Sequence, residues 1–127
     1  MEAKPKILVA DDCSALLDAL QFILGEQGFD VVTFPDKVEA LKTLRAGLSP
    51  DLILTDWSSP RMDGGTFIHA IREFLPHVPI IILSGSGRSL GAVPCALRYG
   101  VHAIIDKPCP VVELQSKINS ALLSARS

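Results

Sequence analysis

Short runs of apolar residues recur along the chain, and each is followed by a stretch with apolar residues at helical spacing. The runs are a few residues long, which suits buried strands. The stretches between them repeat leucine and isoleucine three or four positions apart, as on one face of a helix. The pattern therefore predicts five strand–helix units in succession. The predicted strands cover residues 7–10, 30–34, 51–55, 80–83 and 101–105.

Glycines and capping residues mark the ends of the predicted helices. Gly28 and Gly47 lie where the first and second helices stop. Asp36, with Glu39 three residues later, has the form of a capping pair at the start of the second helix. The third helix carries its apolar positions between residues 67 and 75.

Pro94 shapes the prediction for the fourth helix. Proline is tolerated in a first helical turn and damages a helix interior. We therefore expect a short or late-starting helix that ends at Gly100. The last helix is predicted over residues 110–123. Its inward-facing positions are expected to be Val111 or Val112, Leu114, Ile118, Ala121 and Leu122.

Strands that are apolar throughout, separated by helices, indicate a parallel sheet covered on both faces. The predicted fold class is α/β, a doubly wound five-stranded sheet with right-handed crossovers. The flavodoxin-like strand order 2-1-3-4-5 is the simplest such arrangement. We expect residues 1–127 to form a single domain, with a core at about residues 5–123.

Composition and charge exclude several classes of function. The 127 residues are 48% hydrophobic, and the net charge is -2 without any basic stripe, so direct nucleic-acid binding is not expected. The apolar runs are too short to span a bilayer. Cys13, Cys95 and Cys109 show no metal-ligand spacing. We expect them to be reduced thiols, buried or half-buried, in a cytoplasmic protein.

Polar residues follow four of the predicted strands, at the edge where open parallel sheets form their sites. Asp11 and Asp12 follow the first strand, Asp56 the third, Ser84 the fourth and Lys107 the fifth. Three carboxylates at close range need a cation, and oxygen ligands with room for water suit Mg²⁺. A metal, an ammonium and a hydroxyl around one carboxylate suit phosphoryl transfer to it. We therefore predict that Asp56 is a phosphoacceptor.

Several segments in order carry a resemblance to a known family. They are residues 6–12 with the acidic pair, 51–56 with the following Pro60, Met62, Asp63 and Gly64, 79–85 with its terminal hydroxyl and glycine, and Gly100 with Lys107-Pro108. Along nearly its whole length the chain resembles the receiver domain of two-component response regulators, the CheY-like domains.

The resemblance implies how phosphoryl transfer would proceed. Asp56 would accept the phosphoryl group from a phosphohistidine of a histidine kinase or a histidine phosphotransfer protein. Ser84 would move to hydrogen-bond the phosphate, and Lys107 would contact another phosphate oxygen. The peptide bond between Lys107 and Pro108 would be cis, as cis bonds in proteins precede proline.

The resemblance also implies a magnesium site. Asp12 and Asp56 would bind Mg²⁺ directly, together with the backbone carbonyl of Ser58. Asp11 would act mostly through a metal-bound water.

Three positions depart from the family pattern. Ile104 stands where Tyr or Phe is usual, Ser59 replaces a large apolar residue, and Arg61 replaces a common glycine. With Ile104, the coupling in which an aromatic ring swings inward cannot operate in its usual form. We expect any conformational signal to travel through Ser84 and the glycine-rich segment 85–93.

Structural interpretations stand beside the functional ones. The pair Asp11-Asp12 could be a helix-start signal, and Lys107 could be a solvated lysine, but the complete set favours a site. Asp63-Gly64 is interpreted as a turn. Trp57 shields the site, forms part of a partner surface, or has a half-buried packing role.

Three functions remain open. The first is a signalling switch that catalyses only its own phosphorylation and dephosphorylation, and that acts on a downstream protein as a monomer or weak homodimer. The second is a receiver-like interaction module that no longer uses phosphate. The third is a metal-dependent phosphatase with an aspartyl-phosphate intermediate. Ser58 argues against the third, because haloacid dehalogenase-like phosphatases have a second Asp at that position.

Overall fold

The computed structural model of the chain describes residues 4–58, 61–85 and 91–126. Five parallel strands form one sheet in the order β2-β1-β3-β4-β5. This confirms the predicted doubly wound α/β fold. The strands are β1 (Lys6–Ala10), β2 (Asp30–Phe34), β3 (Leu52–Asp56), β4 (Ile80–Ser84) and β5 (Ala103–Asp106). The helices are α1 (Ser14–Glu26), α2 (Lys37–Arg45), α3 (Gly64–Phe74), α4 (Ala92–Tyr99) and α5 (Val111–Arg126).

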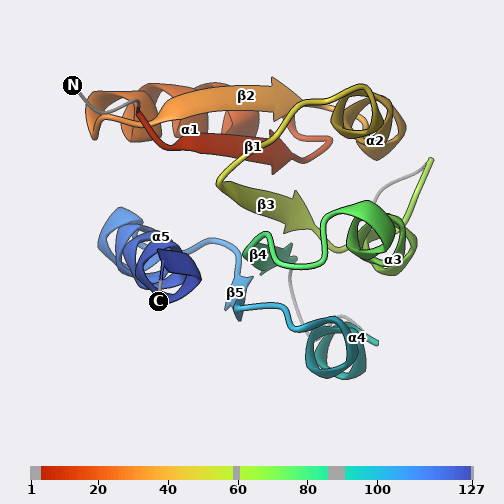
Figure 1. Cartoon of the computed structure of the whole chain (residues 1–127). Helices are drawn as coiled ribbons and strands as arrows, with labels where there is room; N and C mark the ends of the chain where they lie inside the picture. Colours follow the sequence, from red (N-terminus) through yellow and green to blue (C-terminus); the bar gives the residue numbers. More distant parts are fainter. Residues whose placement is uncertain (1–3, 59–60, 86–90, 127) are drawn as a thin grey trace.

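The helices cover both faces of the sheet, so the core has two halves (Figure 1). On one face, α1 and α5 bury Leu17, Leu24 and Ile118 against alternate residues of the central strands. On the other face, α2 and α3 bury Leu44 and Phe67, and residues of α4 pack partly buried beside them. Because successive strand residues point to opposite faces, strands covered on both faces must be apolar throughout.

Helix ends follow the predicted signals. Asp36 is the N-cap of α2, and its Oδ1 accepts from the Val38 backbone N–H at 2.9 Å. Glu39, the second member of the predicted capping pair, forms an ion pair with Lys42 at 3.5 Å, so only the Asp36 half of that prediction is confirmed. The fourth helix is short, as predicted: Pro94 lies in its first turn, and it ends at Gly100, whose φ is +67°.

One expectation for the last helix was wrong. Val111 and Val112 are 43% and 77% exposed, although one of them was expected to face the core. Val111 lines an open cavity of about 450 Å³ between α1 and the segment after β5. The buried positions of α5 begin at Leu114, one turn later, and continue through Ile118 and Ala121.

The expectation that the cysteines are buried or half-buried was wrong for Cys13, which is exposed.

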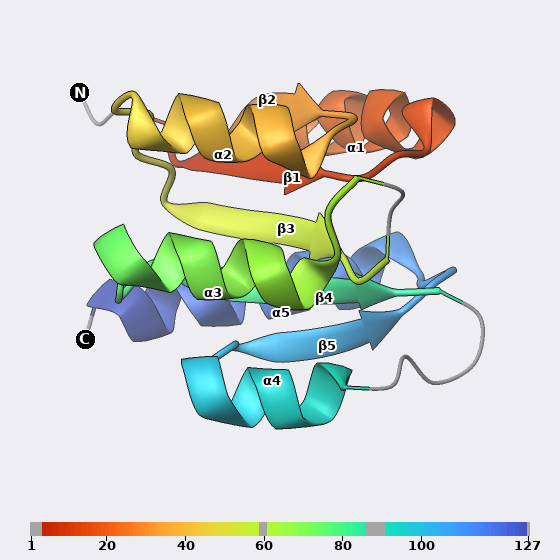
Figure 2. The same ribbon diagram turned by 90° about the vertical axis from the view of Figure 1, so that its right-hand side faces the viewer.

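All the strands run in the same direction, so their carboxyl ends lie together at one edge of the sheet (Figure 2). In the pairing of the central strands, Ala10 lies opposite Thr55 and Asp56 lies opposite Leu83. Ser84 lies opposite Asp106 at the next pair. This register brings the polar residues that follow the strands to one place. None of the helices in the described part of the chain has the length and apolar character needed to cross a membrane.

Candidate functional site

Three carboxylates meet at the carboxyl edge of the sheet. Asp11 and Asp12 directly follow β1, and Asp56 is the last residue of β3. One carboxylate oxygen from each lies within 4.8 Å of the others. Asp11 and Asp56 are buried, whereas Asp12 is exposed. The strand pairing of β1 with β3 creates this cluster from residues more than forty positions apart.

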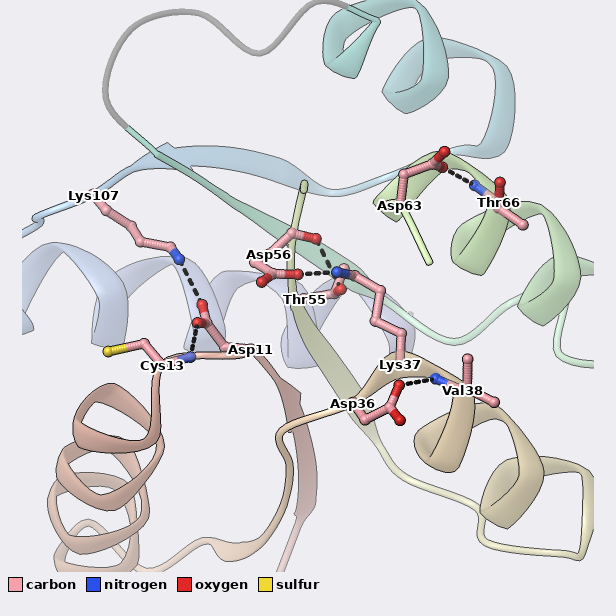
Figure 3. Close-up of polar contacts among 10 residues, drawn as sticks. All are labelled: Asp11, Cys13, Asp36, Lys37, Val38, Thr55, Asp56, Asp63, Thr66 and Lys107. Atoms are coloured by element: carbon pink, nitrogen blue, oxygen red, sulfur yellow. Dashed lines mark hydrogen bonds and ion pairs between the residues drawn. The ribbon is translucent and has the colours of Figure 1, made fainter. Parts of the chain in front are cut away.

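Lys107 binds the cluster from the side of β5. Its Nζ donates to Asp11 Oδ2 at 2.5 Å (Figure 3). Asp11 Oδ1 accepts a second hydrogen bond, from the Cys13 backbone N–H at 2.9 Å. The Asp11 side chain is 0% exposed and that of Lys107 is 29% exposed. The lysine predicted for the site is therefore next to the acidic cluster, and the Lys107–Pro108 peptide bond is cis as expected.

A second lysine binds the Asp56 carboxylate itself. Lys37, the first residue of α2, forms an ion pair with Asp56 Oδ1 (Figure 3). The two side chains are 1% and 3% exposed. Within the described residues, this ammonium is the partner of Oδ1, and Oδ2 has no hydrogen-bond donor.

The pKa of Asp56 reflects this setting. Burial raises the pKa of the carboxyl above its ordinary value, and this is the largest effect. The hydrogen bond and positive charge of Lys37 act in the opposite direction, the charge of Asp11 raises the pKa further, and that of Lys107 lowers it. The two ammonium groups therefore help to keep a buried carboxylate ionised, which is the form that can act as a nucleophile.

Ser84 lies at the end of β4 and Ser58 just after β3, at the same edge of the sheet as the acidic cluster. Ser84 is buried at the end of β4, and its Oγ lies 3.5 Å from the Gly85 carbonyl oxygen. Its own carbonyl oxygen accepts from the Lys107 N–H at 2.7 Å, which fixes the end of β4 beside Lys107. Ser58 is exposed in the loop after β3. Ser59 and the greater part of the 85–93 segment lie outside the described residues.

The loop after β3 folds back against the end of that strand. The Gly64 N–H donates to the Trp57 carbonyl oxygen at 2.6 Å. A Cβ at position 64 would lie 2.9 Å from both the Trp57 ring and this oxygen, and 3.0 Å from the Asp56 carbonyl oxygen. Only glycine fits here without a shift of backbone atoms. Trp57 is half-buried against this turn, which supports its packing role.

Asp63 starts the third helix. It is the N-cap of α3, and its Oδ1 accepts from the Thr66 N–H at 2.7 Å. That hydrogen bond is the main reason that the pKa of the Asp63 carboxyl lies below its ordinary value. Asp63 is thus a capping residue, which agrees with the interpretation of Asp63-Gly64 as a structural turn rather than as a pair of ligands.

Ile104 occupies the position where the family usually has an aromatic residue. Its side chain is partly buried and packs against the core half formed by α2 and α3. In the sheet it lies opposite Ile82. The position is thus occupied by an aliphatic packing residue.

Sequence reasoning missed Lys37. A lysine near the start of an amphipathic helix ordinarily extends into solvent, and Lys37 has no motif around it. One signal was available: a cation in the first turn of a helix opposes the helix dipole, so it is unfavourable unless an anion faces it. That signal indicates a partner but does not say that the partner is Asp56.

The donor set fits a divalent cation. Three carboxylates converge, one of them with a buried oxygen that has no donor within the described residues, and Asp12 is open to water. Hard oxygen ligands with positions left for water are what Mg²⁺ prefers. Asp11, Asp12 and Asp56 could therefore hold a metal ion.

Comparisons with known proteins agree with this site. Residues 7–119 match the family described as response regulator receiver domain. The chain therefore belongs to this family of two-component signalling domains. The cluster of Asp11, Asp12 and Asp56 is the acidic pocket typical of its phosphoacceptor site.

Individual relatives differ in what surrounds the matched region. The chain is 38% identical over 105 residues to protein-glutamate methylesterase/protein-glutamine glutaminase 1 of Anaeromyxobacter dehalogenans, covering 82% of this chain and 30% of that protein. It is 32% identical to transcriptional regulatory protein PrrA of Mycobacterium tuberculosis, covering 93% of this chain and 50% of that protein. The chain thus spans half or less of the length of these curated relatives.

Solved structures support the fold. A CheY-like response regulator receiver domain protein from Methanospirillum hungatei JF-1 superposes with a TM-score of 0.91 over 97% of both chains, at 28% identity. A response regulator receiver domain protein from Clostridium thermocellum gives a TM-score of 0.87 at 31% identity, over 96% of this chain and 97% of that one.

Proposed function

We propose that this chain is the phosphoacceptor receiver domain of a two-component or phosphorelay system, with Asp56 as the acceptor. The observation that carries the proposal is a buried carboxylate at a strand end, beside two further carboxylates and two lysines. Residues 1–127 would form one domain, and the cognate kinase or phosphotransfer protein would supply a phosphohistidine.

The transfer would exchange one bond for another. An Asp56 carboxylate oxygen attacks the phosphorus of the phosphohistidine, the P–N bond breaks, and a P–O bond to the aspartate forms. The imidazole nitrogen leaves with the electron pair and takes up a proton. The protein's part is to position Asp56 and to balance charge around the phosphoryl oxygens.

The neighbouring residues divide this work. Lys107, held at Asp11 before transfer, would contact one phosphoryl oxygen. Ser84 would donate its hydroxyl to another from the end of β4. Asp12, Asp56 and the Ser58 carbonyl would hold Mg²⁺ directly, with Asp11 acting through water. The ion, when bound, would neutralise part of the negative charge on the phosphoryl group.

Phosphorylation would then act as a switch. The phosphoryl group adds about −1.5 to −2 charge at a site that is already acidic. Attraction of Ser84 toward it would pull the segment after β4 inward and shift a two-state equilibrium. A downstream protein partner would recognise the shifted state.

The test is phosphorylation by a small phosphodonor. The protein is incubated with Mg²⁺ and acetyl phosphate, and its intact mass is measured. We expect one added phosphoryl group that is labile to hydroxylamine, absent in Asp56→Asn and absent when EDTA removes the metal. Modification that survives in Asp56→Asn would disprove the assignment of the acceptor.

A receiver-like interaction module that no longer uses phosphate is the second candidate. The buried ion pair of Lys37 with Asp56 favours it, because the acceptor already has a cationic partner. The same experiment separates the two. Metal binding without any added mass, under conditions where a known receiver is phosphorylated, would support the interaction module.

A further inference from the structure

Lys37 lies where a lysine is unfavourable unless something holds it there. Its ammonium is buried, and its position at the start of α2 opposes the helix dipole. Its stem reaches from α2 to the end of β3 (Figure 3). Because a buried ammonium without an anion is costly, the ion pair with Asp56 stabilises this arrangement.

The start of α2 is fastened on both sides of Lys37. Asp36 caps the helix through Val38, and its other carboxylate oxygen accepts from Arg61 of the loop after β3. Lys37 pairs with Asp56, the last residue of β3, from which that loop begins. Two contacts therefore connect α2 to the acceptor strand and its loop. The resemblance to receivers assigns no functional role to Lys37, Asp36 or Arg61 in these contacts.

The proposed chemistry leaves no acceptor oxygen for Lys37. Asp56 has two carboxylate oxygens. After transfer, one would carry the phosphorus, and the other would be a ligand for Mg²⁺ when the ion is bound. Lys37 must therefore give up its present contact with Asp56, and the phosphoryl oxygens then offer its buried ammonium a new anionic partner at the same site. Lysine is well suited to such a contact, as a compact point charge on a flexible stem.

We propose that Lys37 is a further phosphoryl-binding residue that holds Asp56 before transfer and contacts the phosphoryl oxygens afterwards. The inference rests on the proposed function. It adds a role for the α2 side of the site, so that the start of α2 senses the phosphoryl group directly. Before transfer, Lys37 competes with the divalent cation for Asp56; after transfer, it stabilises the phosphorylated state.

These two roles give opposite effects for the same substitution. Lys37→Met removes a positive charge beside the metal site, so Mg²⁺ should bind more tightly, on the order of tenfold. It also removes a cationic ligand of the phosphoryl group, so a phosphoryl mimic should bind more weakly, again on the order of tenfold. A residue with only a structural role would weaken both.

The experiment uses the single tryptophan as a reporter, because Trp57 directly follows the acceptor. Mg²⁺ is titrated first, and beryllofluoride is then titrated at saturating Mg²⁺, into the wild-type protein, Lys37→Met and Lys42→Met. Lys42 lies on the same helix and is 68% exposed. Its ion pair among the described residues is with Glu39, not with Asp56. Lys42→Met should therefore match the wild-type protein in both titrations.

Tighter Mg²⁺ binding together with weaker beryllofluoride binding in Lys37→Met supports the proposal, and any other combination overturns it. Failure of the wild-type protein to bind beryllofluoride would instead count against the proposed function, which keeps the two failures apart. If circular dichroism shows that Lys37→Met does not fold, Lys37→Gln takes its place. Its amide can still donate to Asp56 but carries no charge, so the same two opposite shifts are expected.

Discussion

Two lysines approach the acidic cluster from opposite sides, and they differ in how much each carboxylate depends on its lysine. Lys107, from the segment after β5, is 29% exposed and binds Asp11, which also accepts from the Cys13 N–H. Lys37, from α2, is 1% exposed and binds Asp56, which has no other donor within the described residues. The first pair is partly exposed and its carboxylate has a second donor, whereas the second pair is buried and its carboxylate has no second donor within the described residues.

The comparison shows that how easily a lysine of this site is predicted from the sequence says little about how much it contributes to stability. Lys107 could be predicted from its place in a motif, yet water and a backbone N–H can replace part of what it does. Lys37 has no motif, yet removing it leaves the Asp56 carboxylate buried without a cation in direct contact within the described residues. Breaking a buried pair is more damaging than breaking a hydrated one, because the remaining charge has no alternative partner.

The largest expected effect is therefore on the buried pair. Lys37→Met should lower the free energy of unfolding by about 3–5 kcal/mol in the absence of metal. Lys107→Met should cost less, about 1–3 kcal/mol, because Asp11 retains the Cys13 N–H. Urea unfolding in EDTA, followed by circular dichroism, measures both. Equal losses in the two variants would contradict the comparison. Adding Asp56→Asn to Lys37→Met should restore part of the stability.

The same pair predicts a pH dependence. The pKa of Asp56 is raised in the folded protein, so protonation of Asp56 favours folding: this contribution is full below the unfolded pKa and is lost as pH rises through the folded pKa. Lys37→Met removes a group that lowers this pKa. The stability difference between Lys37→Met and the wild-type protein should thus shrink as the pH falls from 8 to 4, in unfolding curves measured at each pH. A stability difference that increases as the pH falls would contradict this prediction.

A steric test examines the loop behind Asp56. Gly64→Ala would place a Cβ 2.9 Å from the Trp57 carbonyl oxygen, a backbone atom that no rotamer change can move. We expect a loss of about 1–3 kcal/mol in unfolding free energy, typical of overpacking. Gly65→Ala is the matched control, because its nearest contacts are 3.4 and 3.5 Å. It should cost clearly less, as measured by urea unfolding.

A smaller effect is expected at the cap of α3. Asp63→Ala removes the hydrogen bond to the Thr66 N–H and should cost about 1 kcal/mol at neutral pH. Because the pKa of Asp63 is lowered in the folded protein, this stability is present above the unfolded pKa and is lost as pH falls through the folded pKa. In thermal melts, the melting temperature of Asp63→Ala should therefore lie below that of the wild-type protein at pH 7, and the two should agree at pH 3.

The smallest effect concerns the outer contact of α2. Arg61 is 62% exposed in its pair with Asp36, so Arg61→Ala should change the unfolding free energy by less than about 1 kcal/mol. Addition of salt should reduce this difference, whereas the loss caused by Lys37→Met should respond little to salt because that pair is buried. Urea unfolding at low and high ionic strength compares the two.

The sequence by itself determined the fold and most of the acidic site. Periodicity located all five strand–helix units, and the second strand, residues 30–34, was predicted with its observed ends. The positions of Asp11, Asp12, Asp56 and Lys107 follow from one rule, since the carboxyl ends of parallel strands lie at one edge. Local signals also sufficed for the short α4, where Pro94 and Gly100 act within a few residues.

Only the tertiary structure decided the contacts between elements that no local pattern connects. Lys37 is a lysine after an N-cap in the sequence; its burial depends on how α2 packs across β3, nineteen positions from Asp56 along the chain. Val111 and Val112 have the apolar character of core residues, but the burial of α5 begins one turn later. Periodicity states which residues share a face. It does not state which charged group another element will bring opposite a buried one, because that depends on the packing of the whole sheet and its helices.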